Sequence, residues 1–470
     1  MKTTTTNLRQ LRDAQLKAWA IRRPALCADC ASCAVTQFEQ CSTNERHLMN
    51  QPFVFFAARI LVVLLYPAIT TASQLQADEF RSIPLRQSVN AVQPMTGIVL
   101  WTTNEDTATA PIQLEYTYMT YAQIVNSHGE YDWSPLEETL KQVAAREHQL
   151  ILRWHDTYVG EKTGVPESIT RLANYKVTQG KSENKPTEFP DWSHSELRRF
   201  VLEFFSHFAE KYDNDSRMAF VQVGFGLWAE YHIYDGPMTL GQTFPSKKYQ
   251  SEFAKHLAAN LKTTPWMISV DAGDDERSAY PENETLLALN FGLFDDSFNH
   301  AKHKKENEPN WNILGRDRWK LSPTGGEFSF FQKADQIKAL APAGAHGTSF
   351  EKQAAAFHVS FMIGDDQPRF QKPDRIRAAG MTCGYGFELK KFEASVTQCR
   401  CVIRNTGIAP IYYDAFPAVN DVRSLTSLKG LLPGEDRAFD IAAGGSNPTL
   451  TIDCDRLVPG QRISFAADLK

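Results

Sequence analysis

Several features are missing from this sequence of 470 residues, and each absence excludes a class of protein. A basic surplus is missing, because the net charge is −5 with 22% charged residues, so we expect no nucleic-acid partner. The G-x-G-x-x-G fingerprint of dinucleotide-binding proteins and the G-x-S-x-G motif of serine hydrolases are both missing. We therefore expect neither a cofactor nor a serine nucleophile.

A long uninterrupted hydrophobic run is missing as well. The most apolar block, residues 53–72, contains Arg59 and is closed by Pro67, so it is shorter than the roughly 20 apolar residues of a membrane-spanning helix. It is typical of a secretory signal with a cleavage zone near Ala72. Because 48 residues precede Met49, either Met49 is the true start or this block is a membrane anchor. We expect a secreted, periplasmic or cell-surface protein, attached to a membrane only if residues 53–72 stay uncleaved.

Cysteine is missing between Cys41 and Cys383, which leaves four cysteines toward each end of the sequence. The spacing of the first group could hold a metal or cluster, but no nearby His or Cys pair completes a zinc site, so we expect no metal there. This group is Cys27, Cys30, Cys33 and Cys41. The second group is even in number, which permits disulfides in an exported domain without fixing their pairing. It consists of Cys383, Cys399, Cys401 and Cys454.

Eight short apolar runs are present after residue 90, most of them followed by a helix or a long loop. Runs that stay apolar without alternating indicate strands covered on both faces, as in parallel sheets. Their number and a total length of about 280 residues predict a (β/α)₈, or TIM, barrel over residues 86–372, with a doubly wound sheet as the alternative. The runs are 97–106, 112–119, 149–158, 221–226, 265–273, 285–298, 321–331 and 355–368.

The pattern of apolar and polar residues changes after Pro373. Short strand-like runs at near-regular spacing, separated by Gly, Pro, Asn and Asp, predict a small immunoglobulin-like β-sandwich over residues 376–470. The predicted fold class is therefore an α/β barrel followed by an all-β domain. An N-terminal extension over residues 1–85, which carries the signal-like block, precedes both domains.

Two segments show the signature of a capping box, a Ser or Thr followed three residues later by Glu or Gln at the start of a helix. Ser134 with Glu137 and Ser193 with Glu196 fit it, so each serine is the predicted N-cap of a helix. A polar loop of about thirty residues is expected before the second helix. That helix is predicted to bury one wide apolar face. The face consists of Leu197, Phe200, Val201, Phe204, Phe205 and Phe208.

Polar and aromatic residues gather at the ends of the predicted strands, which face the active site in a (β/α)₈ barrel. Taken singly, a polar residue is better explained by a loop and a tryptophan by the core. Taken together, carboxylates at nearly every strand end indicate a site, and tryptophans suit the flat faces of sugars. The expected substrate-binding residues are Trp101, Glu115, Arg153, Trp154, His155, Asp156, Trp228, Tyr231, His232, Asp271, Asp295, Asp296 and Asp365.

Two glutamates are the expected catalytic pair. Glycoside hydrolysis needs one carboxyl that holds a proton and a second that stays ionised. Glu230 has Trp228 and Tyr231 beside it in the sequence, and their rings are expected to desolvate it and favour its protonated form. Glu230 ends the fourth predicted strand and Glu327 the seventh, so we expect the two carboxylates to meet across the barrel at about 5 Å, the retaining geometry.

Four segments resemble motifs of a bacterial family called domain of unknown function 4832: YDWSPLEETL, LRWHDTY, YDNDSRMAFVQVGFGLWAEYHIY and PTGGE. The arrangement also resembles the clan of retaining glycosidases with (β/α)₈ barrels. The resemblance covers roughly residues 90–470 and implies a glycosidase-like barrel followed by a β-sandwich. It implies an acid/base role for Glu230 and a nucleophile role for Glu327. Ala229 departs from the pattern, because the clan usually has Asn there and the family form WGE reads WAE here.

The sequence thus predicts an exported glycoside hydrolase that cleaves poly- or oligosaccharides by a two-carboxylate retaining mechanism. The alternative is a non-catalytic carbohydrate-binding or cell-surface protein on the same barrel, because a fold does not define a function. A carbohydrate is the expected partner in both cases. No metal is expected, because Asp295 and Asp296 lack a clear third ligand and suit contacts to sugar hydroxyls or helix capping.

Overall fold

The computed structural model describes residues 79–300, 305 and 307–470. The predictions for the N-terminal extension, including its four cysteines and the apolar block at 53–72, lie outside the described residues. Within the described ranges, no helix is long and apolar enough to cross a membrane.

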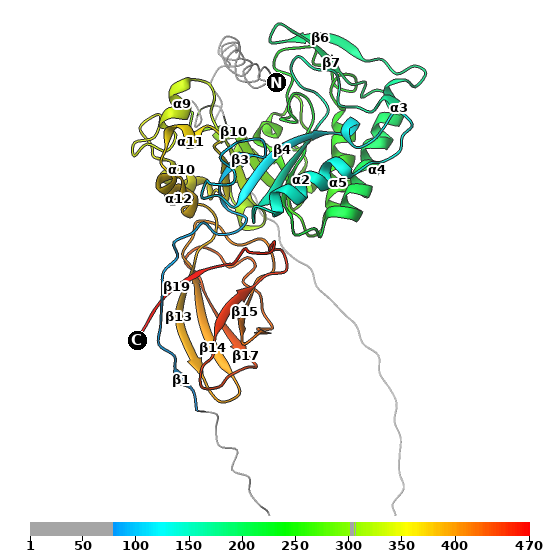
Figure 1. Ribbon diagram of the computed structural model, residues 1–470. Coiled ribbons are helices and arrows are strands. Elements are labelled where there is room, and N and C mark those ends of the chain that lie inside the picture. The colour runs from blue at the N-terminus through cyan, green and yellow to red at the C-terminus, as the bar shows by residue number, and fades with distance from the viewer. Residues whose placement is uncertain (1–78, 301–304, 306) are drawn as a thin grey trace, which may run out of the picture. The chain divides into compact units, whose positions relative to one another are not determined.

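Eight parallel strands form a closed barrel, which confirms the predicted fold class (Figure 1). Each strand pairs in parallel with the next along the chain, and β12 closes the ring by pairing with β3. All eight overlap the predicted apolar runs. The strands are β3 (Gly97–Trp101), β4 (Leu114–Thr120), β5 (Gln149–His155), β8 (Met218–Gln222), β9 (Trp266–Ser269), β10 (Gly292–Phe298), β11 (Thr324–Phe328) and β12 (Phe361–Ile363).

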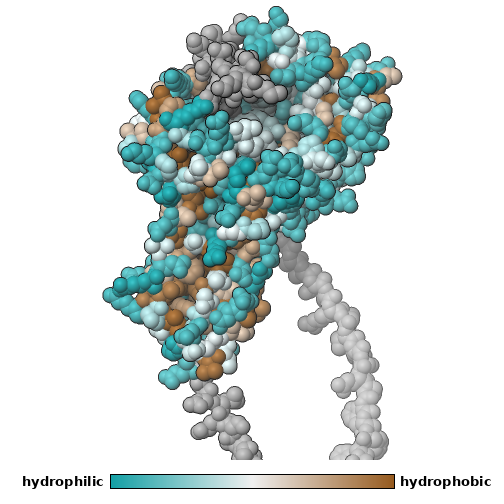
Figure 2. Space-filling model, in the orientation of Figure 1, coloured by the Kyte–Doolittle hydropathy of each residue, from teal (hydrophilic) through white to brown (hydrophobic). Residues whose placement is uncertain are grey.

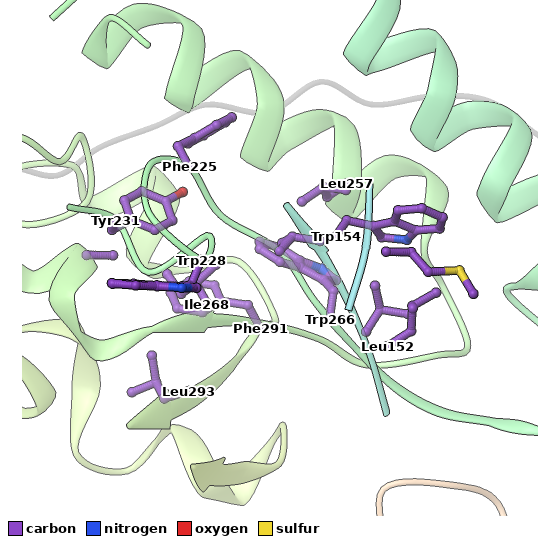
Figure 3. Close-up of a cluster of buried hydrophobic side chains, with 14 of the residues drawn as sticks. Leu152, Trp154, Phe225, Trp228, Tyr231, Leu257, Trp266, Ile268, Phe291 and Leu293 are labelled. Carbon is purple, nitrogen blue, oxygen red and sulfur yellow. The ribbon is translucent and has the colours of Figure 1, made fainter. Parts of the chain in front are cut away.

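Helices lie around the barrel because each has an apolar face that needs a partner. The predicted apolar face of α4 is entirely buried, as the sequence led us to expect. Trp154 and Trp266 of the strands and Leu257 of α5 lie in one buried cluster (Figure 3). The helices are η2 (Tyr121–Gln123), α2 (Ser134–Ala144), α3 (Glu167–Thr170), α4 (Ser195–Tyr212), α5 (Lys247–Asn260), η3 (Val270–Gly273), α6 (Glu284–Leu287), α8 (Glu308–Gly315), η4 (Arg318–Lys320), α9 (Lys333–Lys338), α10 (Phe350–Phe357), α11 (Gln367–Phe370) and α12 (Pro373–Met381).

Both predicted capping boxes are wrong, because neither serine occupies the N-cap position, which is Trp133 in α2 and His194 in α4. In α2, Ser134 is itself helical, and its backbone N–H donates to Asp132 Oδ1 at 2.9 Å. In α4 the cap is His194, whose Nδ1 accepts from the backbone N–H of Glu196 at 3.3 Å. The Ser193 hydroxyl instead donates to an aspartate two residues earlier, at 2.5 Å.

A β-hairpin occupies part of the segment predicted as a polar loop. Strands β6 (Thr178–Ser182) and β7 (Lys185–Phe189) pair antiparallel. The two residues between them, Glu183 and Asn184, have φ of +51° and +61°, the left-handed pair of a type I′ turn. The hairpin end is tied to the loop after β8, because the Glu183 side chain accepts from the Tyr234 hydroxyl and its N–H donates to Asp235 Oδ2 at 2.6 Å.

The C-terminal strands form two sheets, as the regular spacing of short runs indicated. One has the order β17-β14-β13-β19-β2, with β1 pairing on β13, and the other has the order β16-β15-β18. Strands β1 (Arg81–Ser82) and β2 (Leu85–Gln87) precede the barrel in sequence but belong to this domain. The remaining strands are β13 (Phe387–Ala394), β14 (Cys399–Asn405), β15 (Phe416–Val419), β16 (Val422–Arg423), β17 (Asp436–Ile441), β18 (Leu450–Asp453) and β19 (Phe465–Leu469).

One buried cluster joins the interior of the barrel to the interior of the sandwich. Val99 and Phe220 of the barrel strands lie in the same apolar cluster as Phe387 and Phe439 of the sandwich. Arg456 adds polar contacts, because its Nη2 donates to the carbonyl oxygen of Met218 at 2.8 Å and to the Thr264 hydroxyl at 3.2 Å. The two domains therefore share a core.

The four cysteines of the described residues are buried free thiols, so the disulfides that their even number permitted do not form. They are Cys383, Cys399, Cys401 and Cys454. Burial raises the pKa of the Cys401 thiol to about 12, which makes a reactive thiolate rare at neutral pH. These cysteines pack as small apolar side chains.

Surface hydropathy differs between the two domains. On the face shown in Figure 2, hydrophilic residues cover most of the barrel domain, whereas hydrophobic residues gather over the sandwich. The two most exposed large hydrophobic side chains of the described residues, Leu425 at 98% and Val396 at 80%, also belong to the sandwich.

Candidate active site

Arg153 lies at the centre of the candidate site, near the carboxyl end of β5. Its fully buried guanidinium lies 4.1 Å from the ring centroid of Phe294, a residue of the barrel's inner cluster. Nε donates to Gln222 Oε1 at 2.7 Å, and Nη1 donates to the Tyr118 hydroxyl at 3.1 Å. Because arginine keeps its charge when buried, it needs anionic partners.

Two carboxylates supply that negative charge, and both bind the same nitrogen. Arg153 Nη1 lies 3.1 Å from Oε1 of Glu230 and 2.7 Å from Oδ2 of Asp296. These two oxygens therefore lie within about 6 Å of each other. An opposite charge at this distance stabilises a carboxylate relative to its acid. The environment of Glu230 thus differs from the prediction, which placed it among desolvating aromatic rings.

His232 connects Glu230 to a third carboxyl group, Asp271. Nε2 of the imidazole lies 3.4 Å from Oε2 of Glu230 and 3.5 Å from Oδ2 of Asp271. Burial lowers the pKa of His232 below its ordinary value, which favours the neutral ring. Two carboxylates beside Nε2 favour the tautomer with its proton on that atom. Burial also raises the pKa of Asp271 to about 6, because its charged form is poorly solvated.

The loop that carries the glutamate and the histidine is folded tightly back on itself. Trp228, Ala229 and Tyr231 have φ of +55°, +62° and +61°, in the left-handed region that favours glycine. A Cβ atom on Gly224 would lie 1.9 Å from the carbonyl oxygen of Ala229, so the backbone at Gly224 is in direct contact with the backbone at Ala229. Strain of this kind costs about 1–3 kcal/mol per residue and concentrates at functional sites.

Glu327 lies on β11, the strand between β10 and β12. Its side chain is 2% exposed, and Glu327 pairs with Ile363 of β12. Burial raises the pKa of the Tyr116 hydroxyl most, and the charges of Asp296 and Glu327 raise it further. That hydroxyl donates to Gln222 Oε1 at 3.3 Å, so Tyr116 belongs to the Arg153 cluster. The expected separation of about 5 Å between Glu230 and Glu327 stays a prediction.

Four further predicted residues lie beside this cluster. The backbone oxygen of Trp228 accepts from Arg153 Nη1 at 3.4 Å. Trp101 packs on Tyr118 at 5.1 Å between ring centroids, and Asp365 holds the backbone N–H of Trp101 at 2.9 Å. The His155 ring lies 5.2 Å from that of Tyr118, and burial lowers the pKa of His155 to about 4.

Five predicted residues lie outside the cluster. On β5, Trp154 points opposite to Arg153 and packs between helix residues Phe204 and Phe208, at 4.8 and 5.6 Å. Asp156 comes two residues after Trp154, and its carboxylate accepts a hydrogen bond from the Thr157 hydroxyl at 2.6 Å. Both side chains are buried.

The other three residues outside the cluster have structural partners. Glu115 is fully buried in ion pairs with Arg146 at 2.6 Å and His148 at 2.9 Å. Asp295 accepts from Asn307 at 2.7 Å. Tyr231, although adjacent to Glu230, packs against Phe225, Phe244 and Tyr280.

Three residues of the cluster are missing from the predicted set: Tyr116, Tyr118 and Gln222. The signal that would have found them is the two-residue period of a strand, which places Tyr116 and Tyr118 on one face of β4. Gln222 is the last residue of β8 and is fully buried. Its Nε2 and Arg153 Nη2 are buried donors without a partner among the described residues, so they suit a ligand oxygen.

The described part of the chain contains no group of three or more His, Cys, Asp or Glu side chains placed to hold a metal ion.

No protein-family model matches the sequence, and no curated protein matches it. Several solved structures resemble the fold at low identity. The galactosidase domain of an α-galactosidase–sucrose kinase matches with TM-score 0.37 and 11% identity, over 75% of this chain and 55% of that one. Endo-glycoceramidase II from Rhodococcus sp. matches with TM-score 0.37 and 9% identity, over 76% of this chain and all of that one. The α-galactosidase AgaA from Geobacillus stearothermophilus matches with TM-score 0.35 and 11% identity, over 77% and 57%.

The chain thus spans about half the length of the first of these proteins. At such low similarity the fold rests on the strand pairing itself, and the function rests on the site.

Proposed function

We propose that this protein is a glycoside hydrolase that cleaves poly- or oligosaccharides at the mouth of the barrel. The observation that carries the proposal is the pair of carboxylates, Glu230 and Asp296, held on one nitrogen of Arg153. Retaining glycosidases place two carboxyl groups about 5–5.5 Å apart, and the limit of about 6 Å between these oxygens includes that spacing. The buried donors of Arg153 and Gln222 add groups suited to a sugar hydroxyl.

Within this proposal Glu230 acts as a carboxylate. The ion pair with Arg153 stabilises its charged form, which suits attack on an anomeric carbon or stabilisation of the positive charge that develops there. The nucleophile role predicted for Glu327 passes to Glu230 in this proposal, and Glu327 and Asp296 are further carboxylates of the site whose loss should lower activity. A retaining outcome is proposed from the carboxyl spacing.

The test is a screen of aryl glycosides and polysaccharides with the wild type and three amide variants, Glu230→Gln, Asp296→Asn and Glu327→Gln. We expect Glu230→Gln and one of the other two to lower kcat/KM by about 10²–10⁴, the range for lost carboxyl catalysis. Glu210→Gln, at an 83% exposed side chain, is the matched control and should keep full activity. Nuclear magnetic resonance of the first product anomer decides between retention and inversion.

Two results would count against the proposal. Wild-type activity unchanged in all three variants would remove the carboxylates from the mechanism. Binding of a polysaccharide without hydrolysis of any substrate would favour the alternative, a carbohydrate-binding or cell-surface protein.

We also propose that the protein is exported, on the basis of the signal-like block at residues 53–72. Cell fractionation and N-terminal sequencing of the mature chain test this. A new N-terminus near Ala72 supports cleavage, and an intact block in the membrane fraction supports an anchor.

A further inference from the structure

A glycosidase needs a proton donor as well as a carboxylate, and the Arg153 pair is poorly suited to that task. A general acid has to hold its proton near the working pH, whereas an arginine partner favours the ionised form. Glu230 and Asp296 both lie within 3.1 Å of the Arg153 guanidinium. If the proposed function holds, the proton therefore comes from another group of the same site.

Asp271 has the position that such a donor requires. It lies in the η3 turn (Val270–Gly273), which directly follows β9. Its side chain is 30% exposed, more than Glu230 at 16% and Asp296 at 11%, so it is the most accessible of the three to a ligand. Its distance of 3.5 Å from His232 Nε2, which lies 3.4 Å from Glu230, places Asp271 and Glu230 oxygens within about 7 Å.

The charged groups around Asp271 are few and have opposing effects. His232 and Arg277 favour its ionised form, whereas Glu230 and Asp295 favour the acid. Arg277 forms an ion pair with Asp274 at the end of the same turn. Although 30% of the side chain is exposed, desolvation of the covered part outweighs these charges and raises the pKa of Asp271 to about 6, well above that of an ordinary aspartate.

The turn itself is held from the other side by α8. A Cβ atom on Gly273 would lie 2.7 Å from the Cα atom of Asn310 in that helix, so η3 packs on α8 at backbone distance. Because this packing fixes the turn against a helix, it fixes the direction in which the aspartate leaves the backbone.

We propose that Asp271 is the general acid of this site, and that His232 is the residue that positions it relative to Glu230; this role rests on the proposed glycosidase function. In the first step a Glu230 oxygen forms a bond to the anomeric carbon. The bond from that carbon to the leaving oxygen breaks, its electron pair stays on the oxygen, and the oxygen takes the Asp271 proton. In the second step water attacks the same carbon, Asp271 takes the proton of the water, and the bond to Glu230 breaks.

The deciding experiment compares leaving groups in Asp271→Asn. A 2,4-dinitrophenyl glycoside needs no protonation of its leaving group, whereas an unsubstituted phenyl glycoside of the same sugar does. We expect kcat/KM on the phenyl substrate to fall by about 10²–10⁴, the usual contribution of general acid catalysis, and on the dinitrophenyl substrate by less than about tenfold. Glu230→Gln is the contrast, because loss of the attacking carboxylate should impair both substrates.

His232→Gln tests the positioning role through the pH profile. Because Nε2 of His232, which carries the proton of the neutral ring, faces the Asp271 carboxyl group at 3.5 Å, it stabilises the ionised form, and its removal should raise the pKa of Asp271 and move the basic limb of kcat/KM to higher pH. A uniform loss of activity with an unshifted limb would mean that His232 has only a structural role.

Each failure has its own signature. Hydrolysis by the wild type together with an equal loss on both substrates in Asp271→Asn overturns the role of Asp271 and leaves the proposed function standing. Absence of wild-type hydrolysis on every glycoside overturns both. Thermal melting of each variant and a second substitution, Asp271→Ser, exclude misfolding as the cause, and restoration of the phenyl rate by added formate supports the missing carboxyl.

Discussion

Ala229 has a Cβ atom but adopts a backbone conformation that favours glycine. Its φ of +62° lies in the left-handed region, and its side chain is fully buried in the loop after β8. A residue with a Cβ atom pays roughly 1–2 kcal/mol in this region, whereas glycine does not.

We predict that Ala229→Gly raises the free energy of unfolding by about 1 kcal/mol, because it relieves the left-handed strain. Chemical denaturation measures the change. Ala254→Gly, at a buried position inside helix α5, is the control and should lower the same quantity by about 1 kcal/mol. Equal effects at the two sites would contradict the strain.

Asp156 should make the stability of the protein depend on pH. Burial raises its pKa to about 7 in the fold, far above the value of an unfolded aspartate. The unfolded chain therefore loses this proton at lower pH than the folded one, so the stabilising effect of the acid form is lost as the pH rises toward 7. We predict that the free energy of unfolding of Asp156→Asn, taken relative to that of the wild type, rises by about 2–3 kcal/mol between pH 5 and pH 8.

Unfolding curves of both proteins at the two pH values test this. Asparagine still accepts the hydrogen bond of the Thr157 hydroxyl, so the comparison isolates the charge. A constant difference between the proteins would show that Asp156 titrates normally.

At the residue scale, the sequence located five members of the Arg153 cluster but could not separate inward from outward positions. Arg153 and Trp154 were predicted alike, although one faces the barrel interior and the other faces α4. In a covered parallel strand both faces are apolar, so hydrophobic alternation does not mark the side. The glutamate was found for its aromatic neighbours, yet its partner is an arginine 77 residues away in sequence.

Among the elements, the loop after β8 requires glycine at position 224 for its shape. Gly224 has no room for a side chain, because its Cβ would lie 1.9 Å from the carbonyl oxygen of Ala229. We predict that Gly224→Ala displaces Glu230 from Arg153 and lowers activity by about 10²-fold, as a shift near 1 Å does in other sites. Gly386→Ala, where the nearest atom is a hydroxyl oxygen at 3.2 Å, should leave activity unchanged.

A crystal structure of the Gly224→Ala variant would show whether the loop moves. Full activity with the loop in place would mean that the backbone elsewhere absorbs the methyl group.

The barrel strands could be predicted because each is an apolar run bounded by polar residues, and the closed ring confirms that interpretation. The hairpin β6–β7 could not, because its strands are polar and its turn is Glu183–Asn184 rather than a glycine pair. The helix starts were misplaced because Asp132 and His194 compete with nearby serines as caps. Local signals thus identify elements better than they locate their ends.

For the whole molecule, the common core implies that the two domains unfold together. All nine tryptophans precede residue 320, and eight of them lie in the barrel domain, so the sandwich contains none and most of the tryptophan fluorescence reports on the barrel. We predict that Arg456→Ala, in the sandwich, lowers the unfolding free energy seen by tryptophan fluorescence by about 2–3 kcal/mol, because two hydrogen bonds from a buried charge are lost.

The matched control is Arg400→Ala, which removes an exposed ion pair to Asp440 and should change little. A fluorescence transition unaffected by Arg456→Ala, with a separate shift in the far-ultraviolet signal, would show two independent domains.

Strands β1 and β2 and their partners could not be predicted from the sequence. They contain two and three residues, are mostly exposed, and pair with strands more than 300 residues away in sequence. Neither an apolar pattern nor a local turn identifies such partners, so the predicted boundary at residue 86 falls inside β2.

The pairing of β2 with β19 also limits when this part of the sheet can form during synthesis. Gln87 donates to the carbonyl oxygen of Phe465, a partner 378 residues further along. At a synthesis rate of about 5–20 residues per second, roughly 20–80 s separate the appearance of these two residues at the ribosome. The barrel strands are complete before β19 exists, so the edge of the sandwich is the last part of the sheet to close, and until then β2 is an unpaired strand available to chaperones or to other chains.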